Sequence, residues 1–278
     1  MDITSRHTLV SAFAETYAKA DEPHPLRQFE QYDRVMAHRS HDPDTGGRVL
    51  SRRLDLPEGR INGWLRGSQP RGYSQAETID ELGWFDLSWT GDLFSALNEL
   101  LAWIYSSGGI RSGWEPHFIF DTAEMRERIE TLCDRAALNY QATRTGHDDK
   151  PSEIRVASPS APAGRFFHAL GAPKGRKADA TFGLPNYLSL APEEIRREFA
   201  ARYIANRGSE RPNYAADARS IREQRPQAYL EQLRGLFASL TDEEIRRGGE
   251  PEIHLSGGAV ETICAPAKTV VIDTNSQS

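Results

Sequence analysis

The chain contains only two cysteines, Cys133 and Cys264, in 278 residues. Two thiols without a CxxC spacing provide neither a disulfide framework nor a zinc site, and we expect both in a protein core. No apolar run approaches the roughly 18 residues that a membrane-spanning helix needs. The first 19 residues mix apolar with polar side chains and resemble neither a secretory signal nor a transit peptide. These features predict a cytoplasmic protein with no membrane partner.

Positive charge is in slight deficit, with 34 Lys and Arg against 40 Asp and Glu and a formal net charge of −6. This balance excludes a uniformly basic coat for nucleic acid, but it leaves room for local basic patches. A length of 278 residues with 38% hydrophobic residues fits two domains better than one. Glycine-rich phosphate loops, nucleophile elbows and paired catalytic carboxylates are missing, so we predict no cofactor.

The most arginine-rich stretch, between Gly46 and Arg71, has the pattern of two short helices joined by a tight turn. Apolar residues recur with helical spacing on both sides of Asp55, and Pro57 suits the first position of the second helix. Six arginines outnumber two acids here, which leaves a local charge of +4. The arrangement resembles the helix-turn-helix of DNA-binding regulators, whose second helix reads base edges. The candidate DNA-binding residues are Arg52, Arg53, Glu58, Arg60, Asn62 and Arg66.

A helical hairpin used only for packing or dimer contact is the other interpretation of this stretch. It predicts the same buried apolar residues, so both interpretations of this stretch stay open.

The segment Leu97–Ile110 predicts an amphipathic helix that ends at the glycine pair Gly108 and Gly109. From Asp92 onward, the chain can be laid over itself at an offset of about one hundred residues. Each copy predicts a helix, a strand region, a second helix and a strand hairpin, and we expect the second copy to lack a final helix. The matching segments are Glu99–Gly109 with Glu198–Gly208, Thr122–Leu138 with Arg225–Leu240, and Glu153–Ala157 with Glu252–Ser256.

These patterns predict an α+β fold with two domains. A helical helix-turn-helix domain covers residues 1–90, and a duplicated, pseudo-two-fold αββαββ domain covers residues 91–278. The two halves of the second domain are expected at about 91–190 and 191–268, followed by a short polar tail.

The two copies resemble the halves of a LAGLIDADG homing-endonuclease domain. The segments Leu170–Lys177, Leu184–Leu188 and Pro192–Phe199 are similar to the stretch that joins the halves in that family. Together with the helix-turn-helix, the pattern is similar to transcription regulators that keep a degenerate LAGLIDADG domain. The resemblance implies a saddle of two sheets over duplex DNA, with divalent metal held by the last acidic residue of each motif helix.

Those motif acids are missing from this sequence. We place the lost acids at Gly108 and Arg207, where glycine offers no ligand and arginine repels a cation. Trp103 and Arg202 are placed at the small positions where the helices touch, and Trp103 predicts a wider helix separation. We therefore predict no metal site, no catalytic residues and binding without cutting. Two carboxylates that follow the glycine stops are candidates to replace the acids: Glu115 and Glu210.

A second basic patch is predicted in residues 164–178, which contain no acid. On a loop shaped by proline and glycine its cations can approach phosphates, although a solvated loop is the alternative. The predicted function is sequence-specific binding of double-stranded DNA as a transcription regulator, with a homodimer or a protein partner left open. An active or nicking endonuclease and a protein-interaction module are the alternatives. The candidate residues of the second patch are Arg165, Lys174, Arg176 and Lys177.

Overall fold

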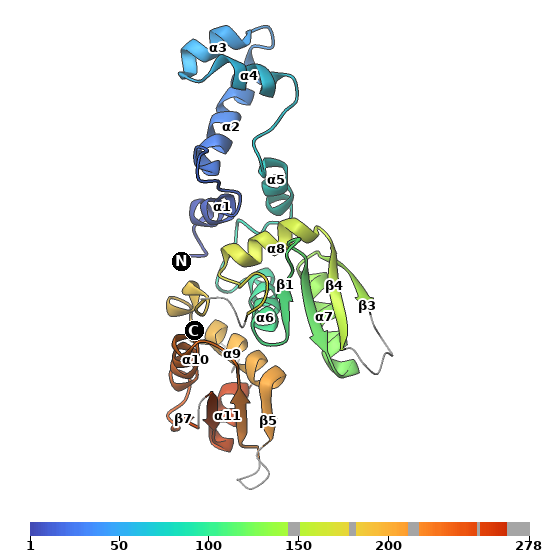
Figure 1. Cartoon of the computed structure of the whole chain (residues 1–278), viewed down its shortest axis with the longest axis vertical. Coiled ribbons are helices and arrows are strands. Elements are labelled where there is room, and N and C mark those ends of the chain that lie inside the picture. Colours follow the sequence, from blue (N-terminus) through green and yellow to red (C-terminus); the bar gives the residue numbers. More distant parts are fainter. Residues whose placement is uncertain (144–150, 178–181, 211–216, 249–250, 266–278) are drawn as a thin grey trace, which may run out of the picture.

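The computed structural model describes residues 1–143, 151–177, 182–210, 217–248 and 251–265. Within these ranges the chain is a mixed α+β protein of eleven α-helices and two four-stranded antiparallel sheets. Figure 1 shows helices α1 to α5 at one end of the molecule and the two sheets toward the other. In the part of the chain so described, no helix is both long and apolar enough to span a membrane.

The first five helices alternate with short turns that contain proline or glycine. Ser5 begins the first of them, because its hydroxyl accepts a hydrogen bond from the Thr8 amide at 3.3 Å. The second is the longest of the five. Their bounds are α1 (Arg6–Glu15), α2 (Pro25–His41), α3 (Gly47–Leu54), α4 (Glu58–Leu65) and α5 (Tyr73–Glu81).

The apolar residues of this helical region fall into two clusters. Helices α1 and α5 share the main core, in which Trp84, from the segment after α5, packs on Phe166 and Phe167. The end of α2 and helices α3 and α4 enclose a separate core. We call this distal part, residues 30–71, the tip. Its core consists of Tyr32, Val35, Leu50, Leu54, Leu56, Ile61 and Trp64.

The rest of the chain repeats one arrangement twice. The sheets have the strand orders β1-β2-β4-β3 and β5-β6-β8-β7, so both halves have the same topology, as the internal duplication predicts. A 3-10 turn, Asn186–Ser189, lies between the halves. The first half comprises α6 (Asp92–Ser107), β1 (Gly108–Ile110), β2 (Pro116–Phe120), α7 (Ala123–Arg135), β3 (Asn139–Thr143), β4 (Ser152–Ser158) and α8 (Ser160–Ala169). The second comprises α9 (Glu193–Arg207), β5 (Gly208–Glu210), β6 (Arg219–Arg222), α10 (Gln227–Ala238), β7 (Arg246–Arg247), β8 (Glu252–Leu255) and α11 (Gly257–Cys264).

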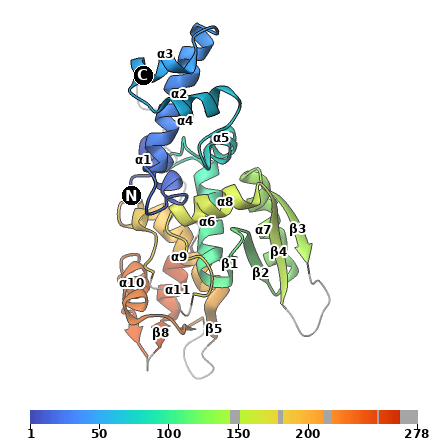
Figure 2. The ribbon, with the colours of Figure 1, turned by 45° about the horizontal axis from the view of Figure 1, so that its top comes forward.

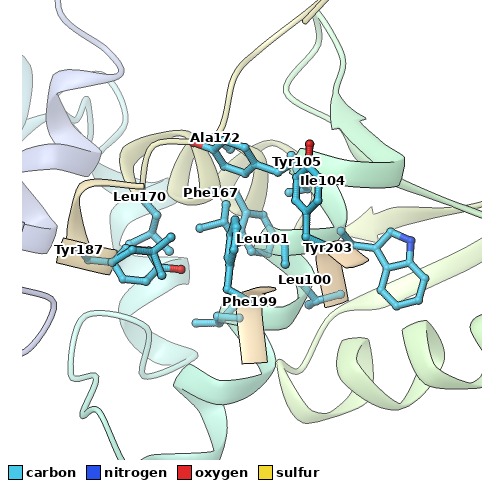
Figure 3. Close-up of a cluster of buried hydrophobic side chains, with 14 of the residues drawn as sticks. Leu100, Leu101, Ile104, Tyr105, Phe167, Leu170, Ala172, Tyr187, Phe199 and Tyr203 are labelled. Atoms are coloured by element: carbon cyan, nitrogen blue, oxygen red, sulfur yellow. The ribbon is translucent and has the colours of Figure 1, made fainter. Parts of the chain in front are cut away.

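Helices α6 and α9 pack directly against each other where the two halves meet, and Figure 2 shows them side by side. Residues 96–106 of α6 are buried without interruption. Figure 3 shows Tyr105 and Phe199 of the two helices among side chains of the segment that follows α8. The Tyr105 hydroxyl donates to the Gly171 carbonyl at 2.6 Å, which fixes that segment over the helix pair.

The expected match between the two central helices is wrong by one residue. Strand β1 begins at Gly108 and β5 at Gly208, so these glycines are counterparts and Arg207 corresponds to Ser107. The expected match had set Gly109, the second glycine of the pair, against Gly208. The position that the resemblance assigns to the lost acid of the first half is therefore Ser107, and not Gly108, and Arg207 remains its counterpart.

The same shift corrects the position of Trp103. Its counterpart is Tyr203, and the small position at the helix contact is Ala102, which is fully buried. The Trp103 indole points into its own half, where Nε1 donates to the Ile119 carbonyl of β2 at 3.0 Å. Arg202 of α9 lies over the Trp103 ring, 4.6 Å from its centroid.

The second half keeps its final helix, contrary to expectation. Helix α11 follows β8 as α8 follows β4, and the Ser256 hydroxyl caps it by accepting from the Ala259 amide at 3.1 Å. Its first two residues are glycines, which disfavour helices and hide the pattern. Cys133 is buried as expected, but Cys264 at the end of α11 is exposed. The polar tail, from residue 266 on, lies outside the described residues.

Replacing Gly108 by alanine is expected to destabilise the protein, whereas Gly235→Ala is expected to stabilise it. A Cβ atom at Gly108 would lie 2.4 Å from the His117 carbonyl oxygen, a backbone atom with little freedom to move. We expect the free energy of unfolding to fall by about 1–3 kcal/mol. Gly235 lies on α10 with nothing within 4 Å of an added Cβ, so alanine there has only the better helix propensity, about 0.5–1 kcal/mol.

Urea denaturation of both variants measures the two changes. If Gly108→Ala is as stable as the wild type, the junction between α6 and β1 can accommodate a Cβ atom, and the predicted clash with the His117 carbonyl is wrong.

Candidate nucleic-acid interface

The turn between α3 and α4 is built from side chains that the sequence makes suitable for it. Asp55 ends α3 with a left-handed backbone, φ 53°. The Ser51 hydroxyl donates to the Leu56 carbonyl at 2.6 Å and closes the turn. Pro57 lies directly before the first residue of α4. Leu50 on α3 and Ile61 on α4 are fully buried in the core beneath, so the two helices are held as one unit.

Four of the six predicted residues of the tip are exposed. Arg52 and Arg53 lie in the last turn of α3, and Glu58 begins α4. Arg66 directly follows α4. All four side chains are open to solvent, as a DNA-contacting surface requires.

The other two predicted residues point into the tip. The Arg60 guanidinium donates to the Gln31 side-chain oxygen of α2 at 3.0 Å. The Asn62 side chain lies against Gly47, where an added Cβ would come within 2.0 Å of its Oδ1. Both residues hold α4 in place, and the structure does not present them as base-reading groups. Helical periodicity could not show this, because a long polar side chain can bend back toward a neighbouring helix.

Arg34 and Arg39 on α2 are also exposed, and so are Arg48 and Arg71 beside the predicted residues of α3 and α4. On and next to α3 and α4, Arg48 and Arg71 therefore add to the predicted arginines. Together with Arg52, Arg53 and Arg66 they make five exposed guanidinium groups. In the described part of the chain, none of the five has a carboxylate within ion-pairing distance. Exposed cations without an ionic partner are the groups available to bind phosphate.

The predicted second basic patch is largely occupied by contacts within the protein. Arg165 is stacked between aromatic rings, 3.8 Å from the centroid of Tyr17 and 4.1 Å from that of Trp114. It also donates to the Thr16 carbonyl, and so it fastens the end of α1 to the first half. The Lys174 amine lies 4.1 Å from the Trp114 centroid on the same ring. These two cations join segments of the protein and are not presented to a phosphate backbone.

Lys177 is also used internally, at the carboxyl end of α6. Its amine donates to the Ile104 carbonyl and, at 3.0 Å, to the Tyr105 carbonyl. Burial lowers the pKa of this amine to about 7, and the nearby positive charge of Arg225 acts in the same direction. Arg176 is the exposed member of the patch. Arg165 and Lys174 differ from Arg176 in that both contact the Trp114 ring, and the sequence does not reveal this contact.

Arg207, Glu115 and Glu210, near the junction of the two central helices, are held in ion pairs or lie exposed. Arg207 donates from Nε to the buried Glu223 carboxylate at 2.8 Å. Glu115 is paired with Arg111 at 2.7 Å, and Glu210 is exposed at the end of β5. Over the residues that the structure describes, no group of three or more His, Cys, Asp or Glu could hold a metal ion.

The polar face of each sheet carries a glutamate at the same position. Glu153 on β4 accepts from Arg111 at 2.9 Å and from Arg155 at 2.7 Å. Burial opposes ionisation, but these two guanidinium groups lower the pKa of the Glu153 carboxyl below its usual value. Its counterpart Glu252 on β8 is paired with His254 at 3.3 Å. The internal repeat aligns Glu153 with Glu252 in the sequence. This alignment could have identified the two glutamates as equivalent residues of the two sheets.

No protein-family model matches this chain, and no curated protein matches it. Function is therefore inferred from the placement of its charged side chains. That placement separates exposed cations at the tip from cations that other parts of the protein already hold.

The Glu153 network gives stability that depends on pH. Because the folded pKa lies below the unfolded value of about 4.3, the stabilisation is complete above that pH and is lost as pH falls. Glu153→Gln is expected to lower the free energy of unfolding at pH 7 by about 1–3 kcal/mol, since the partly buried Arg155 loses its carboxylate partner and Arg111 keeps only Glu115. The difference in the free energy of unfolding between variant and wild type should become smaller between pH 5 and pH 3, and urea denaturation at each pH measures it.

Glu130→Gln provides the control. Glu130 forms a more exposed pair with Arg126 on α7, at 2.8 Å, and its loss is expected to cost no more than about 0.5 kcal/mol. A difference for Glu153→Gln that stays constant down to pH 3 would contradict the assigned ion pairs.

Proposed function

We propose that this chain is a sequence-specific, double-stranded DNA-binding protein that acts as a transcription regulator. The tip binds DNA as a helix-turn-helix, and the duplicated domain is a degenerate LAGLIDADG-like body that does not cut. The observation that carries the proposal is the set of five exposed arginines around α3 and α4. The chain as a whole is acidic, with a net charge of −6, and yet these five arginines lie on or next to one helix pair without a carboxylate partner among the described residues.

The chemistry of the tip suits the two parts of DNA recognition. Arg52 and Arg53, at the end of α3, supply phosphate contacts that position the tip on the duplex. Glu58, at the start of α4, can accept from a cytosine amino group in the major groove, and Arg66 can bind guanine or phosphate. Arg60 and Asn62 keep α4 aligned from below.

The duplicated body has a secondary part in this proposal. Its repeated topology and central helix pair support the LAGLIDADG-like assignment. The charges on its polar sheet faces pair with each other around Glu153 and Glu252. Arginines already held by carboxylates are poor phosphate ligands, so we place the main DNA affinity at the tip.

Selection of bound sequences from a random duplex pool tests the proposal directly. An enriched motif is expected, with an affinity that falls steeply as salt rises. Binding of the enriched duplex is then compared for Arg52→Ala/Arg53→Ala and for a matched control, Arg126→Ala/Arg234→Ala, two exposed arginines of α7 and α10.

The tip variant is expected to bind about 10–100-fold more weakly at physiological salt, and the slope of log K against log salt should decrease by about 2. The control should bind as the wild type does. If both variants lose affinity equally, the tip is not the DNA-binding surface. If the pool yields no enriched sequence and no retention at low salt, the chain does not bind DNA and a protein-interaction role is favoured.

The bound duplex should remain uncut when magnesium or manganese is added. The lost acid positions, Ser107 and Arg207, supply no carboxylate to hold the metal against a phosphate. Supercoiled plasmid that carries the enriched sequence is incubated with each metal and examined for nicks. Nicking that disappears in Glu115→Gln or Glu210→Gln would overturn the non-cutting assignment.

A further inference from the structure

A groove of about 520 Å³ lies between α1, α2 and α5, at the base of the tip. Figures 1 and 2 show α5 beside α1 and the lower part of α2. The floor is apolar and aromatic. Phe29, Ala76 and Phe85 line it, and all three are buried, with Phe29 and Phe85 4% and 2% exposed. The volume is within the range of sites that bind small molecules, about 300–1,000 Å³.

The lining of this groove includes one arginine side chain, Arg6. The Arg6 guanidinium lies 2.6 Å from Asp80 and 2.7 Å from Asp86. It also lies over the Phe85 ring, 5.9 Å from the centroid. Arg6 therefore shows the kind of group that this lining accepts: a planar organic cation between carboxylates and an aromatic face.

The lining also contains three carboxylates that hold no cation of the described chain: Asp33 and Glu30 of α2 and Glu77 of α5. All three are exposed. In the described residues none of the three has a Lys, Arg or His partner within ion-pairing distance. Asp33 accepts from the Tyr73 hydroxyl, and the Tyr73 ring meets Phe29 edge to face at 5.5 Å.

The negative charges of Asp33 and Glu77 act on the neighbouring Tyr73 hydroxyl. Burial raises the pKa of the Tyr73 hydroxyl, and Asp33 and Glu77 raise it further by opposing a second negative charge. An anionic ligand would meet the same repulsion. A neutral apolar ligand would cover the floor but would remove water from carboxylates and give them no partner, which is unfavourable.

We propose that this groove binds a small organic cation with an apolar body. Its ammonium or amidinium group lies among Asp33, Glu30 and Glu77, and its aromatic or alkyl body lies on Phe29 and Phe85. The site is independent of the proposed DNA contacts, because none of its residues lies on α3 or α4.

Calorimetric titration and NMR with three small probes test this assignment without DNA. The probes are 2-phenylethylamine, 2-phenylethanol and phenylacetate, which share one aromatic body and carry positive, zero and negative charge. The amine is expected to bind saturably and at least about tenfold more tightly than the alcohol, and phenylacetate should not bind. Shifts of the Phe29 and Tyr73 ring resonances should report the amine.

Carboxylate variants then locate the cation. Asp33→Asn/Glu77→Gln should weaken amine binding by at least about tenfold, and Glu30→Gln/Glu77→Gln should do the same without touching the acceptor of the Tyr73 hydroxyl. The control, Glu81→Gln/Glu127→Gln, makes the same charge change at exposed positions of α5 and α7 outside the groove and should leave binding unchanged.

Three results would overturn the proposal. One is equal affinity for amine and alcohol, which would mean that the carboxylates have no part in binding. Another is unchanged amine binding in both groove variants. The third is no saturable binding of the amine, or of the amidine benzamidine, up to about 10 mM. Because no probe contacts the tip arginines, these outcomes leave the DNA-binding test untouched.

Discussion

The burial of α6 against α9 is the constraint on which the rest of the structure depends. A helix that is buried from residue 96 to residue 106 has to satisfy every polar group it carries without water. Asn98 donates to the Ile195 carbonyl at 3.0 Å, and Glu99 accepts from Arg202 at 2.7 Å. Arg128 also holds Glu99, and the two guanidinium groups lower the pKa of its carboxyl despite burial. At the carboxyl end of α6, the Lys177 amine donates to the Ile104 and Tyr105 carbonyls.

Arginine has three different roles in this chain, and only the fold distinguishes them. Arg202 neutralises a buried carboxylate and stacks on Trp103 at 4.6 Å. Arg165 has aromatic rings on both faces of its guanidinium. Arg52, Arg53 and Arg66 have neither kind of partner in the described chain. A net charge of −6 therefore says little about nucleic-acid binding, because an acidic chain can still expose a local group of unpaired arginines.

Much of the fold could be predicted from local pattern, and the failures have identifiable causes. Helical spacing and the repeat predicted the order of elements in both halves except for the final helix α11, and the turn at Asp55 was visible in the sequence. The register of the central helices was missed because Gly109, next to the true junction Gly108, offered an equally good match. Of the candidate site, the exposed arginines of α3 were predictable. The inward turn of Arg60 was not, because it depends on Gln31, a partner 29 residues away.

The length of α2 has a mechanical consequence. Its 17 residues form a rod of about 25 Å between the main core and the pair of helices α3 and α4. A tilt of about 10° at its base would move α4 by about 4 Å, more than the rise of roughly 3.4 Å between base pairs. The Arg165 stack, which fixes α1 to the first half, thus helps to set the position of the distant α4, and with it the alignment of the DNA contacts that we propose.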